Sequence, residues 1–357
     1  MSAEQQADIP PTLARRRAAF SERLAERAIR PLWTVFRHLV PLVPHRRLVP
    51  AIWRYGELKA AIMEAGELIT AKEAERRALI LENPARPGEA RITATLYAAI
   101  QLVLPGDVAP AHRHTQSALR FVLEGEGAFT AVDGERTRMS RGDLVLTPRW
   151  TWHDHGNETT EPMIWLDGLD IPLIADLDLG FAEHWPEDRQ ILSRPEEDSP
   201  MRYGEGLLPD GYRAAPAEAS PVFNYRYARC RRALLAAARG GPLDPWTGCK
   251  MRYAHPGTGG WPMATIGPCL QFLPAGFATR PLRATDGRVF VSVEGSGSCL
   301  LEDGVRLDFG PNDIFVVPNW TIHRFAAEDD LVLFSYSDRP VQEALGLWRE
   351  ERLEEEA

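Results

Sequence analysis

The sequence lacks the features that mark several common classes of protein. Its 357 residues include only four cysteines, and none of them forms a CxxC pair, so neither a disulfide framework nor a zinc knuckle is predicted. No run approaches the ~20 consecutive apolar residues that a membrane span needs. The formal net charge of −9 argues against a nucleic-acid surface. We therefore expect reduced thiols, no membrane or nucleic-acid partner, and a cytoplasmic location.

Residues 1–80 are predicted to form a helical N-terminal arm. Residues 14–28 and 57–78 are rich in Ala, Arg, Glu and Leu, and Thr70 is the expected N-cap ahead of Glu73. The intervening segment is rich in proline and tryptophan and is expected to be irregular. The arm has no apolar stretch of the kind found in a signal peptide.

Two regions have the rhythm of β-structure. Over residues 81–173 and again over 251–338, short apolar runs alternate with turn signals such as Asp133-Gly134. This alternation predicts an all-β barrel or sandwich in each region.

The remaining segments are predicted to be connections with short helices. Residues 174–250 are rich in proline and charge, with one helix expected from Tyr227 to Ala238. The last segment, 339–357, is expected to be a helix that runs from Val341 into an acidic tail.

The two β regions are repeats of each other. A constant separation of 170 residues relates turn residues and a closing Pro-x-Trp-Thr-x-His segment, namely Gly125/Gly295, Asp143/Asp313, Pro148/Pro318, Trp150/Trp320 and His153/His323. Agreement at so many turn positions without a gap predicts two copies of one barrel.

Three histidines of the first copy are predicted to bind one metal ion. His112 and His114 are two residues apart, which places them on the same face of a strand. His153 follows 39 residues after His114, where a return strand can bring it across the barrel. The flanking Trp150 and Trp152 are expected to be core residues.

The second copy lacks most of this set. It has Leu282 and Ala284 at the positions of the first two histidines and keeps only His323. One imidazole cannot hold a divalent ion, so we expect a metal-free second barrel in which His323 is simply hydrogen-bonded.

Two further residues are expected to face the ion. Arg120 has the strand parity of His114, and a guanidinium buried near a cation needs an anion between them. A substrate carboxylate would be that anion, although pairing of Arg120 with a structural glutamate is the alternative. His155 has the parity of His153, and a pKa near neutrality would suit hydrogen bonding or proton transfer to the substrate. A purely structural histidine remains the alternative.

The motifs Gly106-x5-His112-x-His114 and Pro148-x4-His153-x3-Asn157 resemble the two cupin motifs. The longer runs at 100–120 and 147–157 are similar to the bicupin ring-cleaving dioxygenases, above all gentisate 1,2-dioxygenases, with salicylate and 1-hydroxy-2-naphthoate dioxygenases as relatives. Most metal cupins add a glutamate ligand shortly after the second histidine, whereas this sequence has Ala118 and Leu119 there. The gentisate-type enzymes are similar in lacking it.

The resemblance implies an all-β bicupin, with two jelly-roll barrels and one Fe(II) per chain in the N-terminal barrel. It implies a 2-hydroxybenzoate chelated by the iron and cleaved by O₂ between the carbons that bear the carboxylate and the hydroxyl, most often gentisate to maleylpyruvate. It also implies a homotetramer, and substrate-binding roles for Arg76, Tyr97, Gln101 and Asp167.

Other functions are open at this stage. A related dioxygenase could cleave salicylate, a substituted salicylate or 1-hydroxy-2-naphthoate. A different class would be a non-oxidative metal isomerase or a ligand-binding cupin.

Overall fold

The computed structural model describes residues 10–215 and 218–354, and the chain divides into two compact units, 1–45 and 46–357. The smaller unit contains α2 (Pro11–Ala25), η1 (Leu32–Thr34) and α3 (Phe36–Leu39), none of which buries a side chain. The first helix begins and ends three residues earlier than the predicted range of 14–28. None of residues 10–45 belongs to a hydrophobic core cluster.

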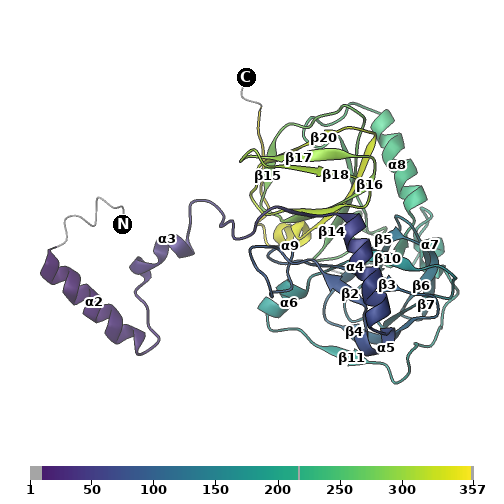
Figure 1. The fold of residues 1–357 in the computed structure, drawn as a ribbon, viewed down its shortest axis with the longest axis horizontal. Helices are drawn as coiled ribbons and strands as arrows, with labels where there is room; N and C mark the ends of the chain where they lie inside the picture. The colour runs from purple at the N-terminus through teal and green to yellow at the C-terminus, as the bar shows by residue number, and fades with distance from the viewer. Residues whose placement is uncertain (1–9, 216–217, 355–357) are drawn as a thin grey trace. The chain divides into compact units, whose positions relative to one another are not determined.

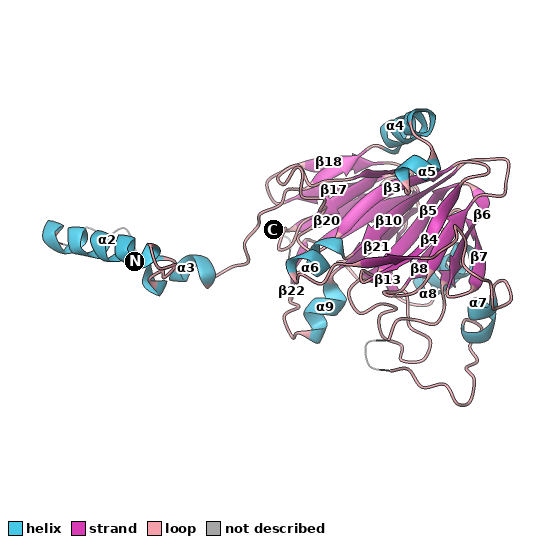
Figure 2. Cartoon of the chain, turned by 90° about the horizontal axis from the view of Figure 1, so that it is seen from below, coloured by secondary structure: helices cyan, strands magenta, loops and turns pink. Residues whose placement is uncertain are grey.

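The larger unit consists of two β-barrels, each made of a six-stranded and a five-stranded sheet (Figures 1 and 2). Barrel one combines the sheets β12-β8-β5-β10-β3-β2 and β11-β4-β9-β6-β7. Its strands are β2 (Ala78–Ile80), β3 (Tyr97–Val103), β4 (Val108–His114), β5 (Ala118–Glu124), β6 (Glu126–Val132), β7 (Glu135–Ser140), β8 (Leu144–Thr147), β9 (His153–Gly156), β10 (Met163–Leu169), β11 (Ala182–His184) and β12 (Asn224–Tyr225).

Barrel two combines the sheets β1-β19-β16-β21-β14-β13 and β18-β17-β20-β15-β22. Its strands are β1 (Ala51–Trp53), β13 (Cys249–Arg252), β14 (Gly267–Leu273), β15 (Leu282–Ala284), β16 (Arg288–Glu294), β17 (Gly297–Leu301), β18 (Arg306–Phe309), β19 (Ile314–Val317), β20 (His323–Ala327), β21 (Leu331–Ser337) and β22 (Glu350–Arg352). The bounds of β3, β5 and β8 recur 170 residues later in β14, β16 and β19, which confirms the predicted repeat.

Strand alternation explains where the cores lie. On β5, Leu119 and Phe121 face the neighbouring six-stranded sheet, and the Phe121 ring stacks on Phe334 at 4.0 Å between centroids. The side chains of Arg120 and Val122 take the opposite face, where Val122 belongs to the apolar cluster inside barrel one. The two barrels thus pack against each other through the apolar faces of their six-stranded sheets. The residues at alternate positions of these strands face the inside of a barrel, where they can form a site.

The prediction of a helical arm up to residue 80 is wrong in its second half. β1 pairs with β19 of barrel two, and β2 pairs with β3 of barrel one. α4 (Tyr55–Leu68) begins where the Tyr55 N–H donates to the Asp313 carboxylate at 2.8 Å. Residues 46–80 therefore belong to the larger unit.

The same connection occurs a second time in the chain. α8 (Tyr227–Arg239) begins where the Tyr227 N–H donates to Asp143 of barrel one at 2.9 Å. The Tyr227 hydroxyl then donates to Glu294 of barrel two at 2.6 Å, as the Tyr55 hydroxyl donates to Glu124 of barrel one at 2.8 Å. Each half of the chain thus supplies a strand and a helix that link the two barrels.

Two predicted helices are shorter than expected. The helix expected over 57–78 ends at Leu68, and Thr70 then forms a capping box with Glu73 at the start of α5 (Ala71–Ala74). The last helix, α9 (Arg339–Ala344), does not continue into the tail, because β22 follows and pairs with β15. Residues 355–357 lie outside the described residues.

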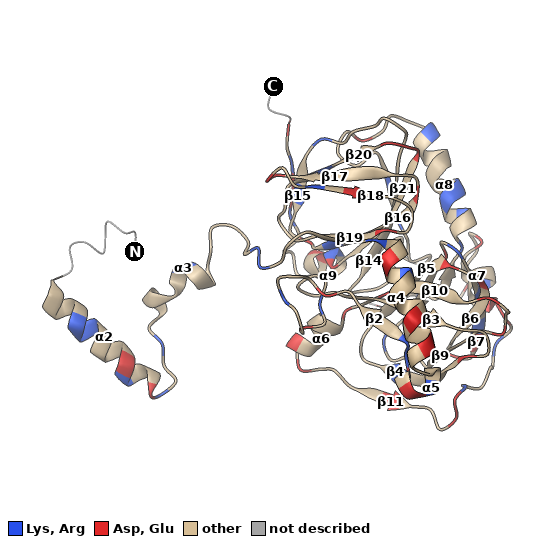
Figure 3. Ribbon diagram, in the orientation of Figure 1, with Lys and Arg blue, Asp and Glu red and all other residues tan. Residues whose placement is uncertain are grey.

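The remaining helices are short, and the charges are mixed. α6 (Ile171–Asp176) and α7 (Asp198–Tyr203) lie in the connection after barrel one. Acidic and basic residues occur on the same helices and loops (Figure 3). Within the described residues, no helix has both the length and the apolar character to cross a membrane.

Candidate metal and substrate site

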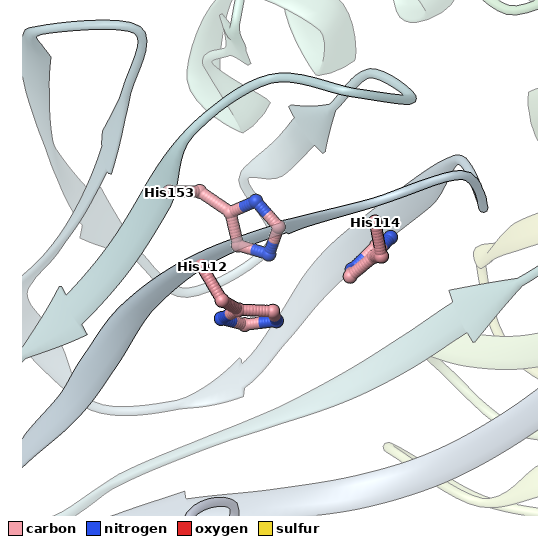
Figure 4. Close-up of side chains that lie close together, drawn as sticks. All are labelled: His112, His114 and His153. Atoms are coloured by element: carbon pink, nitrogen blue, oxygen red, sulfur yellow. The ribbon is translucent and has the colours of Figure 1, made fainter. Parts of the chain in front are cut away.

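The three predicted ligand histidines converge inside barrel one. Antiparallel pairing of β4 and β9 places His112 opposite His153. His114 lies two residues further along β4, on the same face of the strand. The ring centroids of His112 and His153 are 4.3 Å apart, and those of His114 and His153 are 4.8 Å apart. Figure 4 shows the three rings facing a common space, and one nitrogen from each lies within 4.8 Å of the others.

A backbone carbonyl orients each of these rings. The Nδ1 atoms of His112, His114 and His153 lie 3.1, 2.9 and 2.9 Å from the carbonyl oxygens of Pro110, Gln116 and Thr151. At His114 and His153, an Nδ1–H that donates to the carbonyl leaves the Nε2 lone pair free, as in most protein metal sites. The Nε2 of His153 is buried and has no hydrogen-bond partner within the described chain. The three residues therefore fit a divalent metal.

The surroundings keep the three imidazoles neutral. Burial lowers the pKa of His112 to about 3 and that of His114 to about 4, and the nearby guanidinium groups of Arg76 and Arg120 act in the same direction. Burial likewise holds the pKa of His153 well below its usual value. Neutral imidazole is the form that binds a metal.

No acidic side chain of the described residues joins the three-histidine group. Ala118 occupies one position where a glutamate ligand would be expected in other cupins, and Leu119 points into the apolar contact between the barrels. Three neutral ligands leave a divalent ion its full charge and about three of six octahedral positions. Such an ion can accept a chelating anion and a further ligand.

Arg120 is fully enclosed and has a structural partner. Its Nε lies 3.4 Å from Asp167 Oδ1, and its guanidinium donates to the Thr147 hydroxyl at 2.7 Å. The indole of Trp165 donates to the same Asp167 oxygen at 2.9 Å. Burial raises the pKa of Asp167 to about 6, although Arg120 opposes this rise. Arg120 Nε still has no hydrogen-bond partner among the described residues.

His155 is buried on the same face as His153, but its pKa is not near neutrality as expected. Its Nδ1 lies 2.9 Å from the Thr130 hydroxyl, and its Nε2 has no partner within the described chain. Burial and the charges of Arg120 and Arg76 hold the pKa of His155 well below its usual value. The side chain is therefore a neutral hydrogen-bonding group.

The other expected pocket residues come from two elements. Tyr97 and Gln101 have the same parity on β3, and Gln101 is buried opposite Trp165 of β10. Burial raises the pKa of the Tyr97 phenol, and Asp167 adds to the effect. Both side chains thus take the inward face of β3.

Arg76 comes from the turn after α5 and reaches β4. It donates to the Pro110 carbonyl at 2.8 Å and lies 2.5 Å from His112 Nδ1. Burial and the charge of Arg120 lower the pKa of Arg76 to about 10. A buried guanidinium, that of Arg120, and a partly buried one, that of Arg76, therefore lie near the histidines, and Asp167 interacts electrostatically with both.

Three contacts of the site were not predicted. Thr147 holds Arg120, Thr130 holds His155, and Trp165 holds Asp167. Each has the inward parity of its strand, which is the signal that could have identified it. Side-chain hydrogen bonds across the barrel depend on register, and register is not visible in a single sequence.

A repeated two-sheet barrel with three convergent histidines in one copy defines a metal-binding bicupin, and residues 99–169 match the cupin domain family. The chain is 48% identical to gentisate 1,2-dioxygenase 1 of Aquipseudomonas alcaligenes over 96% of this chain and 98% of that one. It is 35% identical to a 1-hydroxy-2-naphthoate 1,2-dioxygenase of Nocardioides sp. over 93% and 87% of the two chains. Salicylate 1,2-dioxygenase of Pseudoaminobacter salicylatoxidans, solved as an adduct with gentisate, superposes with a TM-score of 0.89 at 37% identity, covering 97% and 96%.

The chain therefore belongs to the gentisate 1,2-dioxygenase family of ring-cleaving dioxygenases. This confirms the predicted fold class and enzyme class. The named relatives favour a ring-cleaving dioxygenase over the alternatives of an isomerase and a ligand-binding module.

Proposed function

We propose that this enzyme uses one Fe(II) per chain, held by His112, His114 and His153, to cleave gentisate to maleylpyruvate. The observation that carries the proposal is a set of three neutral imidazoles, two partly buried and one buried, which no carboxylate of the described residues joins. The inward-facing Arg120 lies near them. The 48% identity to a gentisate 1,2-dioxygenase favours gentisate over salicylate and hydroxynaphthoate.

Fe(II) and Arg120 together would bind the carboxylate of the substrate. When bound, Fe(II) supplies positions for the substrate's carboxylate and ortho hydroxyl and for O₂. Arg120 binds the substrate carboxylate, since its buried Nε makes no hydrogen bond among the described residues, although it lies 3.4 Å from Asp167 Oδ1. A carboxylate is a bidentate match for a guanidinium. Arg76 and Arg120 carry two positive charges, and Asp167 carries one negative charge. A substrate anion at this place would balance the remaining positive charge.

Hydrogen bonds from the remaining residues would fix the ring. The free Nε2 of His155 bonds a ring hydroxyl or an oxygen atom of O₂, while Tyr97 and Gln101 line the wall formed by β3. Asp167 keeps Arg120 in place. Apolar packing around the barrel excludes bulk water, which strengthens these polar contacts.

The proposal includes a cytoplasmic homotetramer in which the small N-terminal unit covers a second copy of the chain. Its apolar side chains are exposed, with Trp33 at 68% and Leu42 at 103% of full exposure. The exposed set is Leu13, Phe20, Ile29, Leu32, Trp33, Phe36, Leu39, Val40, Leu42 and Val43. So much uncovered apolar surface is typical of a protein–protein interface. Light scattering on the full chain would give four copies, and a monomer at micromolar concentration would refute the tetramer.

One cuvette experiment tests the catalytic proposal. The protein is loaded with Fe(II) without air, and oxygen uptake is recorded together with ultraviolet absorbance for gentisate, salicylate, 5-aminosalicylate and 1-hydroxy-2-naphthoate. We expect one O₂ consumed per gentisate and the highest kcat/KM for gentisate. A higher kcat/KM for any other member of the panel would overturn the choice of gentisate.

A further inference from the structure

Arg113 lies between two metal ligands in sequence but on the other face of β4. Its guanidinium carbon is 4.6 Å from the ring centroids of both Trp150 and Trp152, so it lies between two indoles. The same group donates to Glu183 of the neighbouring strand β11 at 2.8 and 2.6 Å. Both tryptophans are half-buried, which corrects the prediction that they are core residues.

These contacts join the two segments that carry the ligands. Trp150 and Trp152 lie in the loop that leads into His153, whereas Arg113 lies between His112 and His114. Trp150 adopts φ +62°, a conformation that L residues rarely take. In this conformation its N–H donates to the His114 carbonyl at 2.7 Å.

Barrel two contains the same arrangement without the metal ligands. Arg283 lies 4.6 Å from the Trp320 ring, and its Nε donates to Glu351 at 2.7 Å. Trp320 adopts φ +57°, and its N–H donates to the Ala284 carbonyl at 2.6 Å. The second indole is missing, because Ile322 stands where barrel one has Trp152.

We propose that Arg113 is a positioning residue for the metal site. Its guanidinium, clamped between Trp150 and Trp152 and paired with Glu183, sets the spacing between the histidines of β4 and His153. The inference rests on the proposed metal site. The contacts of the arginine with the first tryptophan and with the glutamate occur in both copies, where they close the barrel. The second indole occurs only where three ligands must meet, and it makes the closure rigid enough for coordination.

The test compares Arg113→Met with Arg283→Met, the same change in the barrel that lacks a metal site. Fe(II) affinity is measured without air by competition with a ferrous chelator, and thermal midpoints are measured on the metal-free proteins. We expect Arg113→Met to weaken Fe(II) binding about 10- to 100-fold, as for other residues that orient metal ligands. Both substitutions should lower the thermal midpoint by similar amounts. Arg283→Met should leave Fe(II) affinity unchanged.

Equal Fe(II) affinity in wild type and Arg113→Met would overturn the proposal, and so would an equal loss in both variants. Trp152→Ile provides a second test if Arg113→Met does not fold, since barrel two accommodates isoleucine at this position. It should weaken Fe(II) binding about tenfold, and unchanged affinity would refute a role for the second indole. Failure of the wild-type chain to bind Fe(II) would remove the metal site itself, and the clamp's role with it.

Discussion

The two barrels have the same strands and turns but different interiors. Barrel one directs Arg120, His155 and the three ligand histidines inward. Barrel two places Phe290 and Phe325 at the positions of Arg120 and His155, and these pack with Phe309 and Phe315 in an aromatic cluster. The chemistry of this fold therefore depends on the inward-facing positions of a few strands and not on the topology.

His323 shows how little one retained ligand means. Its Nδ1 lies 3.0 Å from the Thr321 carbonyl, the same contact that orients His153 in barrel one. Antiparallel pairing places it opposite Leu282, as His153 is placed opposite His112. The geometry of the histidine has been kept although its two co-ligands are absent. An oriented imidazole is thus part of the closing loop as well as a potential ligand.

The largest effect is expected when a ligand of barrel one is replaced by its barrel-two counterpart. His112→Leu copies Leu282 and leaves two imidazoles for the ion. We expect loss of both Fe(II) binding and oxygen uptake. Metal analysis after anaerobic loading and gel filtration checks this, and full iron content in the folded variant would refute the ligand assignment.

Replacing Arg120 should weaken substrate binding next most strongly. A charge-assisted contact contributes about 1.5–3 kcal/mol, which corresponds to a rise in KM of about 10- to 150-fold. Because Arg120→Met alone leaves the buried Asp167 without its ion-pair partner, Arg120→Met/Asp167→Asn is the matched control that separates lost stability from lost binding. Steady-state kinetics with gentisate on both variants should show the rise, and an unchanged KM would remove Arg120 from the substrate site.

A smaller effect is expected at His155, whose counterpart is Phe325. His155→Phe removes a neutral hydrogen bond, of about 0.5–1.5 kcal/mol, so kcat should fall about two- to tenfold while iron content is retained. Thr130→Val is the control, because it removes only the group that Nδ1 contacts. A variant with wild-type kcat would make His155 purely structural.

The smallest effect is expected in barrel two. His323→Ala should leave the iron content and kcat/KM unchanged, because His323 belongs to no group of three potential metal ligands among the described residues. The thermal midpoint should fall, since a buried side chain is lost. Iron loss in this variant would contradict a single site per chain.

Much of the fold and the ligand set could be predicted from the sequence because both depend on periodicity. The turn residues of the first copy recur 170 residues later in the second copy. The spacing of His112 and His114 places them on one face of a strand. Residues 46–80 could not be placed, because β1 and β2 are three residues long and their pairing with distant strands leaves no local pattern. Similarly, the low pKa of His155 depends on burial beside Arg120, which comes from another strand.

The comparison between the barrels is tested most directly by anomalous scattering at the iron edge from crystals of the Fe(II)-loaded enzyme. One peak per chain is predicted, within bonding distance of Nε2 of His112, His114 and His153 and with no carboxylate among its ligands. A peak beside His323, or an aspartate or glutamate completing the coordination of the first ion, would contradict the account.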